Sequence, residues 1–219
     1  MKEVLCERPS VETGVGLLRQ ENKFTLLDCF CGMGGTSDGF SMEGFDVTGI
    51  DIVDAPKMLG YKHRFIQADM LSLKGEDFKG YDVIWGSPPC REFTSCVEPF
   101  SHRWKKPPNL QEGLALVNSY LWFIQSAKPG IWIMENHPNL KKHVIYRSRF
   151  TGKLSNGMRR SFWGNFPIFM LPSSNKKSIW KGKYNNKTRS WERAKIPLAC
   201  SRAFAKACHE ALLEKETCP

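Results

Sequence analysis

Short apolar runs recur along the first two thirds of the chain, and each ends at glycine or at a polar residue. Their length and apolar content are typical of buried strands, which we predict at 24–30, 45–50, 64–67, 81–85 and 131–134. The amphipathic segments between them, 36–43 and about 110–128, predict helices. Thr36 or Ser37 would cap the first helix, and Pro129-Gly130 would stop the second. Alternating strands and helices predict an α/β fold with a mainly parallel sheet.

The pattern weakens in the last third of the chain. Aromatic and apolar residues at 161–171 predict one or two further strands. The stretch 173–195 contains eight basic residues and one acid, with Trp180, Tyr184 and Trp191 interleaved. Such a stretch is either a solvated loop or a nucleic-acid contact, in which cations meet phosphates and flat rings meet bases.

Composition limits the class of protein. With 219 residues, 41% hydrophobic and 25% charged, the chain has the content of one globular domain with a sizeable core. Lys and Arg outnumber Asp and Glu by 32 to 22, and this excess of +10 indicates a polyanionic partner, nucleic acid first and an anionic membrane surface second. The eight cysteines are too few for a disulfide scaffold and include no C-x-x-C spacing, so we expect reduced thiols, no metal and an intracellular protein. No signal peptide and no run of about 18 apolar residues is visible, so we expect no membrane span.

Unusual polar residues fall where the predicted strands end. In an open α/β sheet, this carboxyl edge is where ligands bind. Glycines follow the first strand in Asp28-Cys29-Phe30-Cys31-Gly32-Met33-Gly34-Gly35, and Asp51 lies 19 positions after Gly32. The spacing favours a nucleoside-containing cofactor, whose ribose the acid would bind, over a purely structural turn. Asp69, after the third strand, would either accept a hydrogen bond from an adenine amino group or cap a helix at 70–73.

Two further strand ends carry candidate reactive groups. Ser87-Pro88-Pro89-Cys90 holds a thiol at a rigid turn, because each proline restricts the backbone. A thiolate there would be a nucleophile, whereas most cysteines are inert packing residues. Glu135-Asn136 follows the fifth strand, where a partly apolar site would raise the pKa of the carboxyl and make it a proton donor. The other interpretation is a surface carboxylate at a turn.

The order and spacing of these motifs resemble one family. The glycine motif at 28–35, Asp51, Asp69, Gly-Ser-Pro-Pro-Cys at 86–90 and Met-Glu-Asn at 134–136 look like those of the C5-specific cytosine DNA methyltransferases. By its length and its Phe-Trp-Gly-Asn-Phe-Pro stretch, the chain is similar to the short phage- and archaea-type members.

The resemblance implies a Rossmann-like methyltransferase fold, with a mainly parallel sheet flanked by helices. One methyltransferase domain would span 1–219, with a very small target-recognition segment at about 171–195 and a closing helix at 199–214. The cofactor would be S-adenosylmethionine, which leaves as S-adenosylhomocysteine, with Asp51 on the ribose and Asp69 near the adenine. The residues expected at the cofactor are Asp28, Phe30, Cys31, Gly32, Gly34, Gly35, Asp51, Ile52, Asp69, Met70 and Pro88.

The resemblance also implies the catalytic roles. Cys90 would attack C6 of a cytosine flipped out of the nucleic acid, and Glu135 would hydrogen-bond N3 and the exocyclic amine. Asn136 would support that loop. Arg159 or Arg160 would fill the family's arginine role on the base carbonyl or the thiol side.

The same resemblance makes DNA the expected partner, with RNA as a second candidate, and the protein a monomer from a phage or a restriction-modification system. A mobile loop at 91–109 would close over the target base. The basic residues expected to contact the nucleic acid are Arg91, Arg103, Lys105, Lys106, Lys181, Lys183, Lys187 and Arg189.

The chain departs from the family pattern at several motifs. The family commonly has Gln-x-Phe-Ser after its cysteine and valine after Glu-Asn, where this chain has Arg91-Glu92-Phe93-Thr94 and His137. Three alternatives stay open: the same chemistry on RNA, a catalytically inactive nucleic-acid-binding relative, and a cysteine hydrolase that uses Cys90 with His137 and an asparagine. The hydrolase leaves the glycine motif and Asp51 unexplained.

Overall fold

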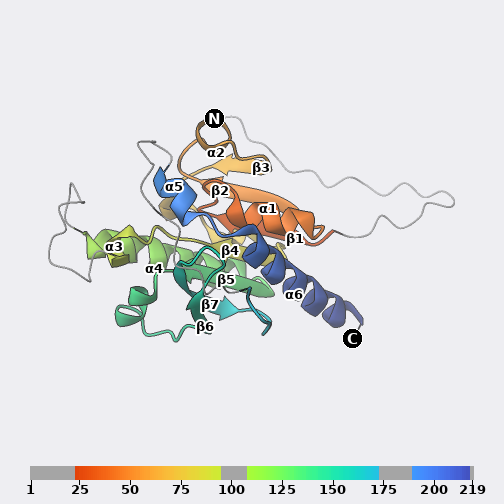
Figure 1. Cartoon of the computed structure of the whole chain (residues 1–219). Coiled ribbons are helices and arrows are strands. Elements are labelled where there is room, and N and C mark those ends of the chain that lie inside the picture. The colour runs from red at the N-terminus through yellow and green to blue at the C-terminus, as the bar shows by residue number, and fades with distance from the viewer. Residues whose placement is uncertain (1–22, 95–107, 173–188, 218–219) are drawn as a thin grey trace, which may run out of the picture.

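A seven-stranded sheet lies at the centre of the computed structural model, which describes residues 23–94, 108–172 and 189–217 (Figure 1). Its strands are β1 Thr25–Cys29, β2 Asp46–Asp51, β3 Arg64–Gln67, β4 Val83–Gly86, β5 Ile131–Asn136, β6 Phe150–Lys153 and β7 Arg159–Asn165. They lie in the order β3-β2-β1-β4-β5-β7-β6. The first five in this order are parallel, whereas β7 runs antiparallel to both β5 and β6. The mainly parallel sheet is therefore confirmed.

Helices cover both faces of the sheet. The helices are α1 Gly35–Met42, α2 Ala55–Leu59, α3 Arg91–Thr94, α4 Leu110–Ala127, α5 Arg189–Ala194 and α6 Leu198–Thr217, and the 3₁₀ turns are η1 Met70–Ser72, η2 Gly75–Phe78 and η4 Pro138–Lys142. On one face α1 lies beside α6, and on the other α4 packs with η1 and η2 (Figure 1). Among the described helices, none is long and apolar enough to cross a membrane.

The sheet is buried on both faces, because successive side chains of a strand point to opposite sides. On β1, Leu26 joins the core beneath α1 and α6, whereas Leu27 joins the core beneath α4. On β4, Trp85 joins the core beneath α1 and α6, whereas Ile84 joins the core beneath α4. Two-sided burial explains why these strands are continuous apolar runs rather than alternations of apolar and polar residues.

Most predicted elements are confirmed, with differences at the ends. The third strand covers 64–67 as predicted, and α4 begins at Leu110. The fifth strand continues through Asn136, so Glu135 lies within it rather than after it. The region 161–171 contributes only one strand, β7, which begins earlier and ends at Asn165. The sequence did not predict β6, because Phe-Thr-Gly-Lys has no apolar run.

The predicted cap of α1 is wrong. Gly34 precedes this helix with a left-handed backbone (φ 72°), and no side chain caps it. Thr36 and Ser37 lie inside the helix and are buried. The Ser37 hydroxyl instead donates to Asp28 of β1 at 2.6 Å. It therefore joins the helix to the neighbouring strand and does not cap the helix.

Candidate active site

The loop after β1 has a left-handed backbone at three positions. Phe30, Gly32 and Gly34 have φ angles of 61°, 49° and 72°. Glycine is favoured in this region because a Cβ strains it. The loop is fastened to the end of β2, because the Gly32 amide donates to Asp51 Oδ2 at 2.9 Å and the Val53 amide to Asp51 Oδ1 at 3.2 Å. Asp51 therefore maintains the shape of the glycine loop.

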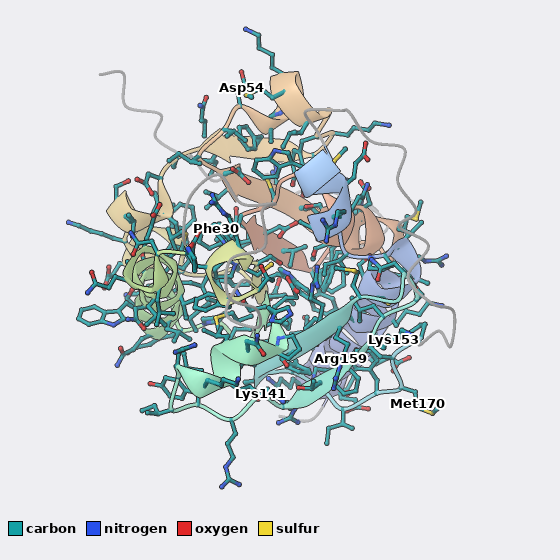
Figure 2. All side chains as sticks on the ribbon, turned by 60° about the vertical axis from the view of Figure 1, so that its left-hand side comes forward. Phe30, Asp54, Lys141, Lys153, Arg159 and Met170 are labelled. Atoms are coloured by element: carbon teal, nitrogen blue, oxygen red, sulfur yellow. The ribbon has the colours of Figure 1, made fainter. Side chains whose placement is uncertain are left out.

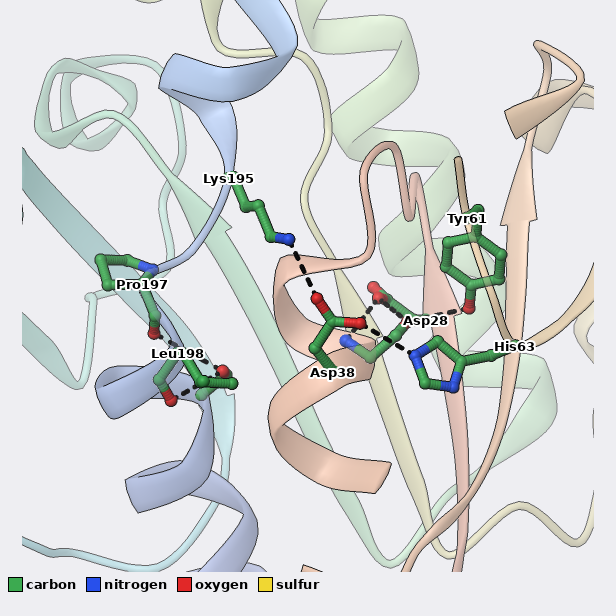
Figure 3. Close-up of polar contacts among 9 residues, drawn as sticks. Asp28, Asp38, Tyr61, His63, Lys195, Pro197 and Leu198 are labelled. Atoms are coloured by element: carbon green, nitrogen blue, oxygen red, sulfur yellow. Dashed lines mark hydrogen bonds and ion pairs between the residues drawn. The ribbon is translucent and has the colours of Figure 1, made fainter. Parts of the chain in front are cut away.

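A second carboxylate lies at the base of the same loop. Asp28 is 2% exposed and accepts hydrogen bonds from the Ser37 amide at 3.2 Å and the Ser37 hydroxyl at 2.6 Å. The Ser37 hydroxyl in turn lies 2.9 Å from the Tyr61 hydroxyl (Figure 3). Burial raises the pKa of Asp28 to about 7 in spite of these bonds, so the carboxyl titrates near neutral pH.

The segment between α5 and α6 closes against the start of α1. Lys195 Nζ lies 2.9 Å from Asp38 Oδ2, and His63 Nε2 lies 3.1 Å from Asp38 Oδ1 (Figure 3). A Cβ on Gly35 would stand 2.7 Å from the backbone nitrogen of Ile196. Glycine at this position thus lets the C-terminal segment approach the first helix directly.

Trp191 of α5 covers the glycine loop itself. Its ring atoms Cε3 and Cζ3 lie 3.2 and 3.4 Å from the place where a Cβ on Gly32 would stand. In the sequence, Trp191 stands out only as one of the aromatic residues of a basic stretch. Trp191 and Gly32 lie far apart in the chain. The sequence around each of them contains no pattern that predicts their contact.

The remaining predicted cofactor residues differ in exposure. Ile52 is 61% exposed, whereas Met70 and Cys31 are buried. Asp69 Oδ1 accepts the Leu71 amide at 3.0 Å, which is the capping role expected as one of its two interpretations. Burial raises the pKa of the Cys31 thiol, so it stays protonated.

Cys90 follows β4 at the same carboxyl edge. Gly86 ends the strand, and Tyr120 of α4 packs where a Cβ would stand, with a ring atom only 2.2 Å from that point. The side-chain amide of Asn136 donates to the Pro88 carbonyl at 2.9 Å. This bond ties the Pro-Pro-Cys turn to the end of β5. Cys90 itself is half-buried, immediately before α3.

Glu135 is buried beside an arginine. Glu135 and Arg160 are 4% and 5% exposed, and Arg160 Nε lies 2.5 Å from Glu135 Oε1. The contact is an ion pair, and this oxygen accepts no hydrogen bond from any described residue. Ser87, whose hydroxyl accepts the Trp85 indole N–H at 2.8 Å, also hydrogen-bonds the Glu135 side chain. The carboxyl group is thus held from two sides, by the Arg160 guanidinium and by the Ser87 hydroxyl.

The thiol and the carboxyl share one electrostatic environment. Burial raises the pKa of Glu135, while the Arg160 charge and the Ser87 hydrogen bond act in the opposite direction. Burial also raises the pKa of Cys90, with Arg160 lowering it, Glu135 raising it and Arg193 lowering it again. The Cys90 thiol is therefore protonated in the free protein, and Glu135 takes up a proton more readily than an exposed glutamate does.

Of the two candidate arginines, the structure brings only Arg160 to Glu135. Arg160 is buried, whereas Arg159 is exposed, since neighbouring residues of a strand point to opposite faces. Burial and the charges of Arg160 and Arg159 lower the pKa of His137. Its Nδ1 accepts the Asn139 amide at 3.2 Å, and no hydrogen bond between described residues joins His137 to Cys90.

The predicted nucleic-acid contacts lie mostly outside the described residues. Arg103, Lys105 and Lys106 fall within 95–107, and Lys181, Lys183 and Lys187 fall within 173–188. Arg91 opens α3 directly after Cys90, and Arg189 opens α5. In the part of the chain that the structure describes, no group of His, Cys, Asp and Glu could hold a metal ion.

The sequence is similar to those of known proteins. The family model of the C-5 cytosine-specific DNA methylases matches residues 24–155. The type II methylase M.HgiDII of Herpetosiphon aurantiacus is 25% identical over 126 residues, which are 53% of this chain and 33% of that protein. This chain therefore spans about a third of the length of that relative.

One solved structure shows a similar fold. A prophage-encoded protein of Escherichia coli, assigned as a DNA modification methyltransferase, is 21% identical with a TM-score of 0.50, over 65% of this chain and 46% of that one. The methyltransferase EhMeth of Entamoeba histolytica is 14% identical with a TM-score of 0.47, over 72% and 58% of the two chains. Because the family model covers more than half of the sequence, the chain belongs to the C-5 cytosine-specific DNA methylases, a family of S-adenosylmethionine-dependent methyltransferases.

Proposed function

We propose that this protein transfers a methyl group from S-adenosylmethionine to C5 of a cytosine flipped out of DNA. The observation that carries the proposal is the buried Glu135 carboxyl, which pairs with Arg160 at the same sheet edge as Cys90. A protonated carboxyl is the group that can hydrogen-bond the N3 of a cytosine ring, and its second oxygen can accept from the exocyclic amine. The thiol supplies the nucleophile.

The reaction needs both groups because C5 of cytosine is a poor nucleophile within an aromatic ring. The Cys90 sulfur adds to C6, and the electron pair of the C5–C6 double bond shifts toward C5 and N3. Glu135 delivers its proton to N3, which leaves C5 electron-rich. C5 takes the methyl group as its bond to the sulfonium sulfur breaks, S-adenosylhomocysteine leaves, and N3 returns its proton to Glu135. Transfer of the C5 proton to a base then expels the Cys90 thiolate and restores the C5–C6 double bond. The raised pKa of Glu135 suits it to be the donor.

The thiol requires activation before it can attack. Burial raises the pKa of Cys90, so the sulfur is protonated in the free protein. The positive charges of Arg160 and Arg193 act in the other direction and favour the thiolate. We infer that Arg160 serves both reactive groups, since its charge also holds Glu135 in place.

The residues around the glycine loop fit the cofactor. The Asp51 carboxylate accepts backbone amides from Gly32 and Val53, and each carboxylate oxygen can accept more than one donor, so Asp51 suits the hydroxyls of a ribose. Ile52 presents an exposed apolar side chain next to it, and Trp191 closes the other side of the loop. S-adenosylmethionine supplies an electrophilic methyl group when bound at this edge.

The target base must leave the duplex to reach Cys90, because the carboxyl edge cannot enter a base stack. Residues 91–109 and 171–195 would contact the flanking nucleic acid, and the small size of the second segment suits a limited recognition surface. The whole of 1–219 would act as one methyltransferase domain.

A trapping experiment tests the proposal. Oligonucleotides with 5-fluorocytosine at one position and randomised flanks are incubated with the protein and S-adenosylmethionine. Fluorine cannot leave as a proton does, so a covalent adduct through Cys90 should accumulate on denaturing gels and in peptide mass spectra. Matched DNA and RNA pools separate the two substrates. Trapping confined to RNA would overturn the DNA assignment, and absence of trapping in both pools would overturn the cytosine chemistry.

A further inference from the structure

The middle of the chain has a long stretch without acids. From Asn136 to Trp191, 56 consecutive residues include 13 Lys and Arg and not one Asp or Glu. The excess of basic over acidic residues in this stretch is 13, whereas the excess over all 219 residues is 10. The positive charge of the chain is therefore concentrated in this stretch. The longest described part of this stretch, residues 136–172, shows where most of these described charges lie.

This part leaves the candidate active site and returns to it. It starts at Asn136, beside Glu135, and comes back to the site along β7 at Arg160. Between these points lie η4, an extended segment and the β6–β7 hairpin. Both ends of this segment therefore lie at the candidate active site, and a ligand bound along the segment would extend to that site.

Five basic side chains of this segment form what we call the basic face: Lys141, Lys142, Arg147, Arg149 and Lys153. The first four are exposed and Lys153 is half-buried. No ion pair joins any of the five to a carboxylate of a described residue. Their charges are consequently available to an external anion.

The basic face lies on ordered strands and turns. Lys153 pairs with Arg159 across β6 and β7, and Lys141, Lys153 and Arg159 lie along the same side of the molecule (Figure 2). The Arg149 guanidinium lies 5.4 Å from the centre of the Phe166 ring, and the Arg149 amide donates to the Phe162 carbonyl at 2.8 Å. Packing thus places these charges on ordered strands and turns rather than on a solvated tail.

Two exposed apolar side chains lie within the same face. Ile145 is 92% exposed and Tyr146 is 58% exposed, and the Trp163 indole donates to the Tyr146 carbonyl at 3.1 Å. An exposed ring among cations suits stacking against a base, which a purely solvated loop does not require. Charge and ring together point to a nucleic acid rather than to a small anion.

We propose that the basic face binds the phosphate backbone of the nucleic acid on one side of the target base. The inference rests on the proposed function, since it places the flanking strand beside the base held at Glu135. It adds a contact surface on η4 and the β6–β7 side, separate from residues 91–109 and 171–195. An anionic membrane surface is the competing partner for exposed cations, and continuity with the active site favours the nucleic acid.

The test compares two charge-matched variants of the full chain. The first carries Lys141→Gln, Lys142→Gln, Arg147→Gln and Arg149→Gln. The control carries Lys57→Gln, Lys62→Gln, Lys74→Gln and Lys79→Gln, four exposed lysines that lie outside the basic segment in the sequence. Binding of a fluorescent DNA duplex is measured by anisotropy over a salt series, and S-adenosylmethionine binding is measured by calorimetry. Vesicles of phosphatidylglycerol form a third arm.

Each lost phosphate contact should reduce the slope of log affinity against log salt by about 0.9, so the first variant should lose about 2 to 4 units of slope. The control should keep the wild-type slope, and both should bind S-adenosylmethionine like wild type. An equal slope loss in both variants, or a defect confined to vesicles, would overturn the inference. Wild-type protein that binds neither DNA nor S-adenosylmethionine would overturn the proposed function instead. If the fourfold variant does not fold, the pairs Lys141/Lys142 and Arg147/Arg149 are tested separately, and each should lose about half of the slope change.

Discussion

Asn136 donates its side-chain amide to the Pro88 carbonyl at 2.9 Å, and its own Oδ1 accepts the His137 amide at 2.8 Å. The residue is fully buried, so water does not compete for either bond. One side chain thereby connects the strand that carries Glu135 to the turn that carries Cys90. The relative placement of a nucleophile and a proton donor depends on this connection.

Replacing Asn136 with alanine should slow the formation of the 5-fluorocytosine adduct by about tenfold or more, because a small misplacement of reacting groups is costly. The free energy of unfolding should fall by about 1–3 kcal/mol, since the Pro88 carbonyl loses its donor. Asn165→Ala is the matched control, because Asn165 Nδ2 also donates to a backbone carbonyl, that of Gly130, at an exposed position. Equal slowing in both variants would contradict the positioning role.

Cys90→Ala should abolish methyl transfer and adduct formation while leaving S-adenosylmethionine binding within about twofold of wild type, because only the nucleophile is removed. Glu135→Gln should slow transfer by about 10²-fold or more, since an amide cannot deliver the proton. Cys208→Ala, in the core beneath α6, is the control for loss of a thiol. Turnover that survives in Cys90→Ala would refute the nucleophile assignment.

Arg160→Gln should lower the free energy of unfolding by about 3–5 kcal/mol, because it leaves Glu135 buried without its charge partner. Arg159→Gln, one position away and exposed, should change stability by about 0.5 kcal/mol or less. Urea unfolding of the two variants provides the comparison. Equal stability losses would show that the ion pair does not distinguish these arginines.

Asp28 should make stability depend on pH. Its pKa is 3.8 ordinarily and about 7 in the folded protein, so between these values the folded state keeps a proton that the unfolded state has released. The contribution of Asp28 to the free energy of unfolding therefore falls as pH rises from about 4 to about 7, and it is constant above.

Asp28→Asn cannot titrate, so its free energy of unfolding relative to wild type should increase between pH ~5 and pH ~8. Urea titrations at both pH values measure this difference, with the exposed Asp77→Asn as the control. A difference that does not change with pH would show that Asp28 titrates outside this window.

Gly32→Ala should weaken S-adenosylmethionine binding by about tenfold, roughly the 1–2 kcal/mol that a Cβ costs in a left-handed backbone. The new methyl group would also stand 3.2 Å from the Trp191 ring. Gly60→Ala is the matched control, because Gly60 has φ 71° but no atom near its missing Cβ. Calorimetry measures the affinity of both variants for S-adenosylmethionine, which separates the backbone cost from the Trp191 contact. Equal affinities in Gly32→Ala and Gly60→Ala would show that the Trp191 ring plays no part.

Local patterns were sufficient for much of the fold. The strand at 64–67 and the start of α4 at Leu110 follow from short apolar runs and from a helical stripe that Asn109 caps. The carboxyl edge was also predictable, because parallel strands bring Asp51, Cys90 and Glu135 to one side of the sheet whatever the loops do. The sequence by itself therefore determined which residues gather and which chemistry they suggest.

Tertiary structure decided what depends on pairing and register. Arg159 and Arg160 are neighbours with the same side chain, and only the antiparallel pairing of β7 with β5 makes one of them the partner of Glu135. Trp191 reaches Gly32 because α6 docks on α1 and carries α5 with it. The physical reason is that strand order, register and helix docking arise from burial summed over the whole chain, whereas a sequence pattern reports only the preference of each segment.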